Sequence, residues 1–169
     1  MGVQTTNILG AIIIGVGATL IMDLWALFLK SAFDIPSLSY CLVGRWFLHM
    51  PEGTFTHTNI AAAQRNRLEC AIGWIAHYAI GVVLAILLIV IVSGRWLTNP
   101  TLLPALFFGI GTVLFPFLIL QPSLGFGVAA SSTPNPMKAR LKSLTTHIVF
   151  GLGLYVSAFG VNYVLRFHG

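Results

Sequence analysis

Charged residues are scarce in this chain of 169 residues: Asp, Glu, Lys and Arg together make up 8% of it. Ordinary soluble domains carry roughly 25%. Because so few charges cannot cover a water-facing surface, the composition excludes a soluble globular domain. Apolar residues account for 57% of the chain, and the mean hydropathy is +0.90. These values together predict an integral membrane protein.

The chain also lacks the motifs of several functional classes. It has no Walker loop, no G-x-S-x-G elbow and no G-x-G-x-x-G after a strand. No run of five or more Lys and Arg residues accompanies the net charge of +5, so a nucleic-acid partner is not expected. The two cysteines, Cys41 and Cys70, form no C-x-x-C pair and are interpreted as packing residues or free thiols.

Four apolar runs are long enough to cross a hydrocarbon core, which takes about 20 residues. They cover residues 8–29, 70–92, 101–120 and 141–165. In lipid each backbone polar group must be satisfied within the protein, so each run is expected to be a helix. The sequence therefore predicts an all-α, polytopic membrane protein made of one domain, residues 1–169, with four transmembrane helices.

The connection between the first two runs contains an apolar piece of its own. YCLVGRWFLHM, residues 40–50, follows Pro36-Ser37 and precedes Pro51. Apolar and aromatic residues around one arginine are typical of a helix in the membrane interface. We expect a re-entrant or interfacial segment here.

Lys and Arg are distributed unequally between the two ends of the predicted bundle. Two of them, Arg95 and Arg166, lie at the end that holds both termini. The first and third connections hold the other seven: Lys30, Arg45, Arg65, Arg67, Lys138, Arg140 and Lys142. The positive-inside rule therefore predicts that these connections are cytoplasmic and that both termini lie outside the cytoplasm.

Three ionisable residues interrupt the apolar runs at a common depth. Asp23, His77 and His147 each lie seven or eight residues, about 10–12 Å, from the predicted cytoplasmic end of their helix. A charge facing lipid at a helix centre costs about 2.5–3.5 kcal/mol on the insertion scale, so we expect these side chains to turn inward and meet. We predict a polar pocket open to the cytoplasm, and its expected supporting residues are Glu69, Gln121, Arg140 and Ser143.

Several chemistries fit one Asp and two His residues. They match the ligands of a divalent metal such as Zn or Fe, and a His pair can ligate haem. Asp and His also form proton relays in transporters, and a purely structural hydrogen-bond network is a further alternative. The leading hypothesis is a site that binds a metal ion or small solute, for transport or sensing. The alternatives are a membrane-embedded metal or haem oxidoreductase acting on a lipid-phase substrate, and a structural subunit of a membrane complex. The sequence leaves open whether the protein is an enzyme.

Two further sets of polar residues lie close in sequence to the residues expected in the pocket. Lys138, Arg140 and Lys142 are candidates for contact with an anionic lipid headgroup. Membrane lipid is thus one expected partner. A single four-helix bundle is small for a transporter, so we also expect a homo-oligomer or a larger membrane complex. Residues of the first connection could form a lid over the pocket: Arg45, His49, Glu52 and His57.

Seven stretches together resemble a bacterial family of small membrane proteins that is catalogued only as a domain of unknown function. They are GATLIMDLW (17–25), LVGRWFLHM (42–50), GTFTH (53–57), GWIAHY (73–78), NPTLLPAL (99–106), TPNPMKARLKSLTTH (133–147) and FGLGLY (150–155). The resemblance covers nearly the whole chain. It implies a four-helix protein of the bacterial inner membrane, but no activity and no catalytic residue.

Overall fold

In the computed structural model, the backbone is described for residues 2–168 and the side chains for residues 8–93 and 96–164. The described backbone contains helices and connections but no strand. Helices long and apolar enough to cross a membrane occupy Ile8–Phe33, Glu69–Ile91, Leu102–Ser123 and Pro136–Val164. The all-α fold and the four predicted spans are confirmed. The side chains of Arg95 and Arg166, which entered the charge count, lie outside the described residues.

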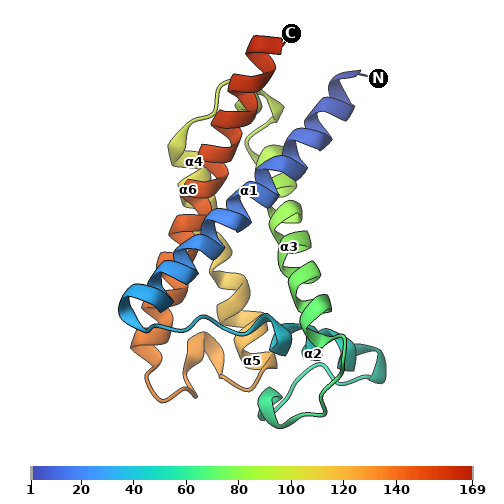
Figure 1. Cartoon of the computed structure of the whole chain (residues 1–169), viewed down its shortest axis with the longest axis vertical. Helices are drawn as coiled ribbons and strands as arrows, with labels where there is room; N and C mark the ends of the chain where they lie inside the picture. Colours follow the sequence, from blue (N-terminus) through green and yellow to red (C-terminus); the bar gives the residue numbers. More distant parts are fainter. Residues whose placement is uncertain (1, 169) are drawn as a thin grey trace.

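The helices run up and down between two ends of the molecule (Figure 1). The long ones are α1 (Gly2–Phe33), α3 (Glu69–Ile91) and α6 (Pro136–His168), with α4 (Leu102–Thr112) and α5 (Gln121–Ser123) in the third span. The short helix α2 (Tyr40–His49) lies between α1 and α3. Figure 1 shows both chain ends at the top and α2, α5 and the third connection at the bottom. The expected helical segment between the first two spans is therefore present.

The third span is not one regular helix. After Thr112 the chain makes a turn at Val113, and Pro116–Leu120 forms a π-helical turn that leads into α5. Pro116 has no N–H to donate to the carbonyl of Thr112, so the regular hydrogen-bond ladder cannot continue there. Such widened turns often occur at functional sites. Here the turn brings Phe115, Pro116 and Leu120 to the wall of an internal cavity.

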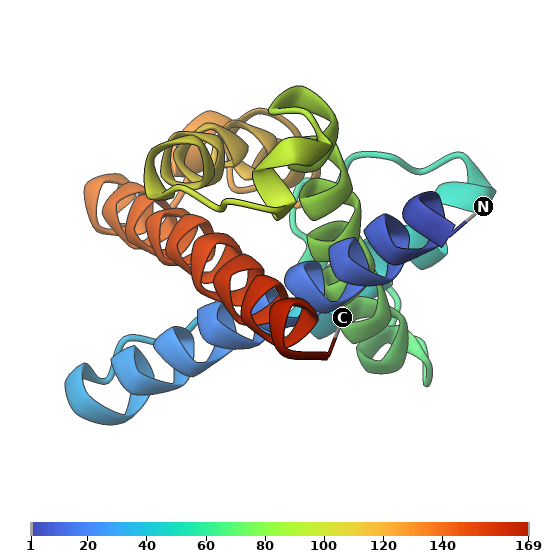
Figure 2. The ribbon, with the colours of Figure 1, turned by 90° about the horizontal axis from the view of Figure 1, so that it is seen from above.

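Small residues allow the long helices to cross at close range. Gly153 of α6 faces the backbone of Ala18 in α1, and Gly109 of α4 faces the backbone of Gly151. Such small residues are the usual contacts between membrane helices. Seen from above, α1 and α6 cross at an angle (Figure 2).

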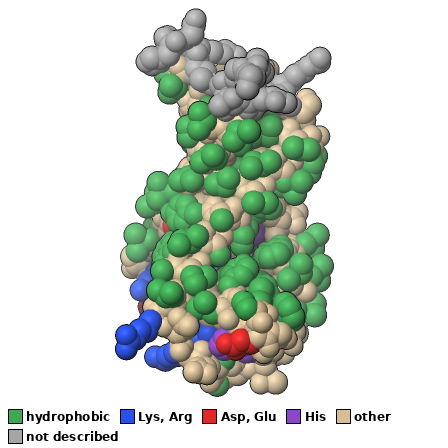
Figure 3. Space-filling view, turned by 90° about the vertical axis from the view of Figure 1, so that its right-hand side faces the viewer, with side chains coloured by type: hydrophobic (Ala, Val, Ile, Leu, Met, Phe, Trp, Pro, Cys, Tyr) green, Lys and Arg blue, Asp and Glu red, His purple; other side chains and the backbone are tan. Residues whose placement is uncertain are grey.

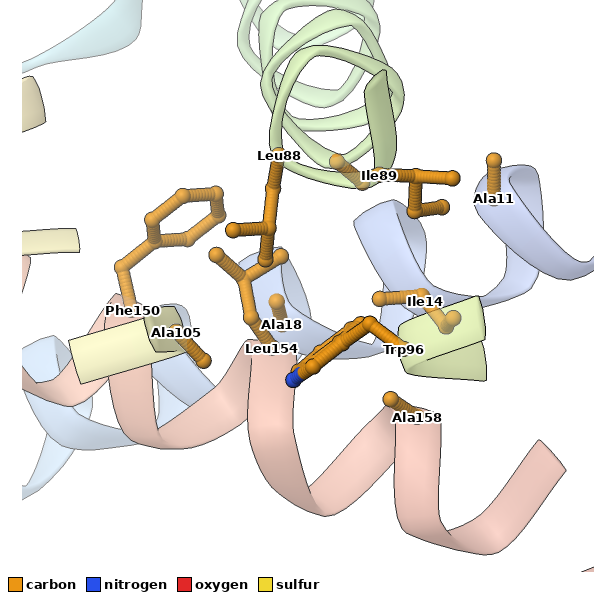
Figure 4. Packing of buried hydrophobic residues seen from close by; sticks show 11 residues of the cluster. Ala11, Ile14, Ala18, Leu88, Ile89, Trp96, Ala105, Phe150, Leu154 and Ala158 are labelled. Atoms are coloured by element: carbon orange, nitrogen blue, oxygen red, sulfur yellow. The ribbon is translucent and has the colours of Figure 1, made fainter. Parts of the chain in front are cut away.

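Apolar side chains fill the half of the bundle nearer the termini (Figure 4). Ile14 from α1, Leu88 from α3 and Leu154 from α6 are almost completely buried and point toward one another. The outer surface is also apolar: Figure 3 shows hydrophobic side chains covering the middle of the molecule, with Lys, Arg, Asp and Glu gathered near one end. This banded surface is typical of a protein that spans a membrane.

The helix α2 packs against the first turns of α3 at very short range. A Cβ atom added at Gly44 would overlap the carbonyl oxygen of Glu69, and one added at Gly73 would overlap that of Tyr40. These two glycines therefore let the backbones touch.

At the same contact Cys41 and Cys70 form a disulfide across 29 residues of sequence. The interpretation of these cysteines as packing residues or free thiols was wrong. The reason is that α2 folds back onto α3 and places two distant positions side by side, which the spacing in the sequence does not reveal.

The glycine contact generates a stability prediction. Replacing Gly44 with Ala should lower the free energy of unfolding by about 1–3 kcal/mol, because the added methyl group forces α2 away from α3. Gly111→Ala is the matched control, since a Cβ atom there meets nothing within 4 Å. Thermal unfolding of the purified variants in detergent, followed by circular dichroism, measures the difference. Equal midpoints for the two variants would contradict the proposed contact.

Candidate functional site

The carboxylate of Asp23 in α1 is surrounded by hydrogen-bond donors from two other helices. Its Oδ1 lies 2.9 Å from His77 Nε2 and accepts a bond of 3.2 Å from the Tyr40 hydroxyl. Its Oδ2 accepts a 3.0 Å bond from the Tyr78 hydroxyl. The structure therefore brings the sequence candidates Asp23 and His77 together, and it adds two tyrosines that sequence reasoning missed.

Aromatic contacts hold the His77 ring in place. Tyr40 stacks on it with ring centroids 3.9 Å apart, and Trp74 meets it edge-on at 6.0 Å. Burial, together with the neighbouring Asp23 carboxylate, raises the pKa of Tyr40 well above its usual value. The Tyr40 hydroxyl therefore keeps its proton and remains a donor to Asp23.

The proton of His77 can be placed from this network. The carboxylate of Asp23 only accepts hydrogen bonds, so the facing Nε2 must carry the proton. In the neutral ring the other nitrogen, Nδ1, is then a hydrogen-bond acceptor. A carboxylate behind a histidine fixes the tautomer in this way in many functional sites.

His147 of α6 presents an acceptor by the same reasoning. Its Nδ1 lies 2.8 Å from the Thr112 hydroxyl, which also lies 2.6 Å from the carbonyl oxygen of Gly109. The single hydroxyl hydrogen of Thr112 goes to that carbonyl, so Nδ1 of His147 must donate. Its Nε2 is therefore the free acceptor in the neutral ring.

Both histidines line one cavity of about 440 Å³ between the helices, which is partly open to the surface. It lies in the half of the bundle away from the termini, between α1, α2, α3, the π-helical turn and α6. Most of its wall is apolar and includes Met22, Leu84, Phe115, Phe126 and Phe150. Its polar side chains, besides the two histidines and Tyr40, are Thr19, Ser37, Gln121, Thr133, Lys142, Ser143 and Thr146.

A third acceptor belongs to Gln121. Its side-chain nitrogen donates a 3.3 Å bond to the Ser143 hydroxyl, while its Oε1 is buried and has no partner among the described residues. Of the four predicted supporting residues, Gln121 and Ser143 thus line the cavity. Acceptor atoms are therefore offered by three residues that lie on different elements and line this cavity: His77, His147 and Gln121.

The other two predicted supporting residues do not lie among the residues that line the cavity. Glu69 is 9% exposed and forms an ion pair with Arg45. Arg140 donates from Nε to the carbonyl oxygen of Ala129 at 2.8 Å. Neither lines the cavity, because each is drawn to a partner in the connections at the end of the bundle.

Arg45 is a structural clamp instead of part of a lid. It is 3% exposed, and its Nε and Nη2 bond the two carboxylate oxygens of Glu69 at 2.8 and 2.9 Å. Its Nη1 also bonds the carbonyl oxygens of Ile60 and Ala61, at 2.9 and 3.1 Å. Buried charges are tolerated when they are paired and hydrogen-bonded in this way.

The remaining lid candidates lie at the end of α2, where His49 is the last residue, and in the connection after it. His49 Nδ1 and His57 Nε2 are 2.9 Å apart, and Glu52 is exposed. The His57 backbone N–H donates to the carbonyl of Ser123 at 2.9 Å, which holds this segment against α5. None of the three lines the cavity. A lid role for them stays a prediction.

The described residues do not form the predicted three-ligand metal site. No group of three or more His, Cys, Asp and Glu side chains among them could hold a metal ion. Asp23 and His77 pair with each other, whereas His147 bonds Thr112. The three candidates therefore form two separate hydrogen-bonded pairs, Asp23 with His77 and His147 with Thr112, and not one ligand set.

The Asp23 network generates a second stability prediction. Asp23→Leu should lower the free energy of unfolding by about 1–3 kcal/mol, because it leaves the donors of Tyr40, His77 and Tyr78 without their acceptor. Asp34→Asn, at an exposed position, is the control and should leave stability unchanged. Unfolding of the variants in mixed micelles measures both values. A fully stable Asp23→Leu protein would contradict the role of this carboxylate as the common acceptor.

Comparison with known proteins places the chain in a family. Neither the comparison with curated proteins nor that with solved structures found a match. A family model described as "Protein of unknown function (DUF2938)" matches residues 12–161, a range that contains Asp23, His77, Gln121 and His147. With four membrane-spanning helices and a match over most of its length, the chain belongs to this family of unknown function.

Proposed function

We propose that this protein binds a small, largely apolar molecule that carries hydrogen-bond donors, in the cavity lined by His77 and His147, and that it transports or senses this molecule. One observation carries the proposal. Three acceptor atoms, on His77, His147 and Gln121, have no partner among the described residues, and these residues surround one cavity of about 440 Å³. A hydroxyl or amine group on the ligand would satisfy them.

The size and lining of the cavity support a compact ligand. Ligand pockets in proteins measure roughly 300–1,000 Å³ and are mostly apolar with a few polar groups that set orientation. The wall of aromatic and aliphatic residues suits a hydrocarbon or ring body. An unpaired buried acceptor is costly, so a molecule without donors would bind less well.

The Asp23–His77 pair also supports coupling of binding to a proton. If the ligand gives a proton to Nδ1 of His77, the resulting imidazolium lies 2.9 Å from the Asp23 carboxylate. The two groups would then form an ion pair across that distance. This arrangement supports a proton-linked transporter or sensor over a purely structural network.

A metal or haem oxidoreductase receives less support from the geometry. Asp23 and His77 bond each other whereas His147 bonds Thr112, so the three do not offer one shared ligand set. Metal analysis and an absorption spectrum of the purified protein test this alternative directly. A stoichiometric metal or a Soret band that disappears in His77→Ala would replace the present proposal.

The ligand proposal predicts that filling the cavity removes a bound molecule. Ala139 lines the cavity, whereas Ala79 is exposed on α3 and does not line it. Compounds extracted from the purified wild-type protein are analysed by mass spectrometry and should include a donor-bearing molecule. The extracts of Ala139→Phe and His147→Ala should lack this molecule, and the extract of Ala79→Phe should contain it. Identical extracts from all four proteins would contradict the proposal.

We further propose that the protein lies in the bacterial inner membrane, with α2 and the third connection on the cytoplasmic side. Seven of nine Lys and Arg residues at that end support this orientation. The Cys41–Cys70 disulfide lies at the same end, and disulfides persist mainly in oxidising compartments. In the proposed orientation this pair is reduced in the cell and closes after isolation.

Alkylation in intact cells tests the orientation. A membrane-permeant maleimide added before lysis should modify both cysteines, whereas an impermeant maleimide should modify neither. A Ser132→Cys variant with both native cysteines replaced by Ser reports access at the same end, since Ser132 is exposed. A pair that resists both reagents until it is reduced, or a Ser132→Cys thiol that reacts with the impermeant reagent, would reverse the orientation.

A further inference from the structure

A second hollow opens on the outside of the bundle, where the end of α1 lies beside the beginning of α6. Its volume is about 470 Å³. Its apolar lining residues are Trp25 and Leu29 of α1, Ile35 of the following connection, and Met137 and Leu141 of α6. We refer to this hollow as the α1–α6 groove.

Cationic residues border the α1–α6 groove on one side. Lys138 and Lys142 are four residues apart on α6, so they lie on the same face of the helix. Lys138 is exposed, and the Lys142 ammonium donates one bond of 2.8 Å to the carbonyl of Pro36. An ammonium group has three N–H donors, so Lys142 has two more to offer. Arg140, the third headgroup candidate, bonds Ala129 and does not line the groove.

An independent observation concerns Trp25, which also lines the α1–α6 groove. Its indole N–H is buried and has no acceptor among the described residues. Buried tryptophan N–H groups usually find a partner, and at membrane interfaces tryptophan lies at the level of the headgroups. A molecule in the groove that carries ester or phosphate oxygens would supply the acceptor.

We propose that the α1–α6 groove is a binding site for an anionic phospholipid. The phosphate lies against Lys138 and Lys142, and one acyl chain lies along Trp25, Leu29 and Leu141. The juxtaposition of two cations with an apolar trough and an unpaired indole donor matches a lipid that is anionic at one end and apolar at the other. This site is separate from the proposed ligand of the internal cavity and does not depend on it.

The lipid site borders the internal cavity. Leu29, Ile35 and Lys142 line both hollows, so a bound lipid covers the wall between the cavity and the bilayer.

Native mass spectrometry of the full-length protein with phosphatidylglycerol or phosphatidylcholine tests the proposal. The wild-type protein should prefer phosphatidylglycerol. Each Lys near a headgroup contributes roughly a fivefold gain in binding, so Lys138→Gln with Lys142→Gln should weaken phosphatidylglycerol binding roughly 25-fold and leave phosphatidylcholine binding unchanged. Arg67→Gln removes an exposed charge from a connection at the same end and should have no effect.

Two further experiments distinguish binding of the whole lipid from binding of its phosphate group alone. Thr145→Trp narrows the groove but keeps both lysines, so it should weaken binding of both lipids. Soluble glycerol phosphate should fail to displace phosphatidylglycerol, because it lacks the acyl chain. Equal binding of the two lipids to the wild-type protein, an unchanged preference in the double variant, or displacement by glycerol phosphate would each overturn the proposal. None of these results depends on whether the internal cavity holds a ligand.

Discussion

A carboxylate inside an apolar helix must be surrounded by donors, and much of this structure depends on how Asp23 meets that requirement. No described side chain of its own helix, α1, donates to it, and the donors come from Tyr40 of α2 and from His77 and Tyr78 of α3. The carboxylate thereby joins three helices at one depth. It also sets the tautomer of His77, which links a requirement of stability to the chemistry of the cavity.

The helix α2 connects the hydrogen-bond network of Asp23 to the end of the bundle. Tyr40, Cys41, Gly44 and Arg45 lie within two turns, and all four contact α3 or the residue at its start. The backbone contact at Gly44 sets the distance between the helices, and the Arg45–Glu69 ion pair holds their orientation. Because Tyr40 both stacks on His77 and lines the cavity, any change that moves α2 also changes the proposed binding site.

The sequence was sufficient for the helices and for the depth of the polar residues, because apolar length and charge are local properties. It did not reveal Tyr40 as a partner of Asp23, since the contact depends on how α2 folds back onto α3. Nor did the sequence reveal the partners of Glu69 and Arg140, which bond residues in the connections. The disulfide was missed for the same reason: Cys41 and Cys70 become neighbours only through the glycine contact.

The two hollows have opposite chemical character, and this difference gives each a selectivity. Acceptor atoms of His77, His147 and Gln121 mark the internal cavity, and they would repel an anion unless it brought donors of its own. The external groove carries Lys138 and Lys142 and attracts an anion. Lys142 lines both, so it stands between a region suited to donor-bearing molecules and one suited to anionic lipid. In the proposed arrangement a donor-bearing ligand would occupy the cavity, while an anionic lipid would lie in the external groove.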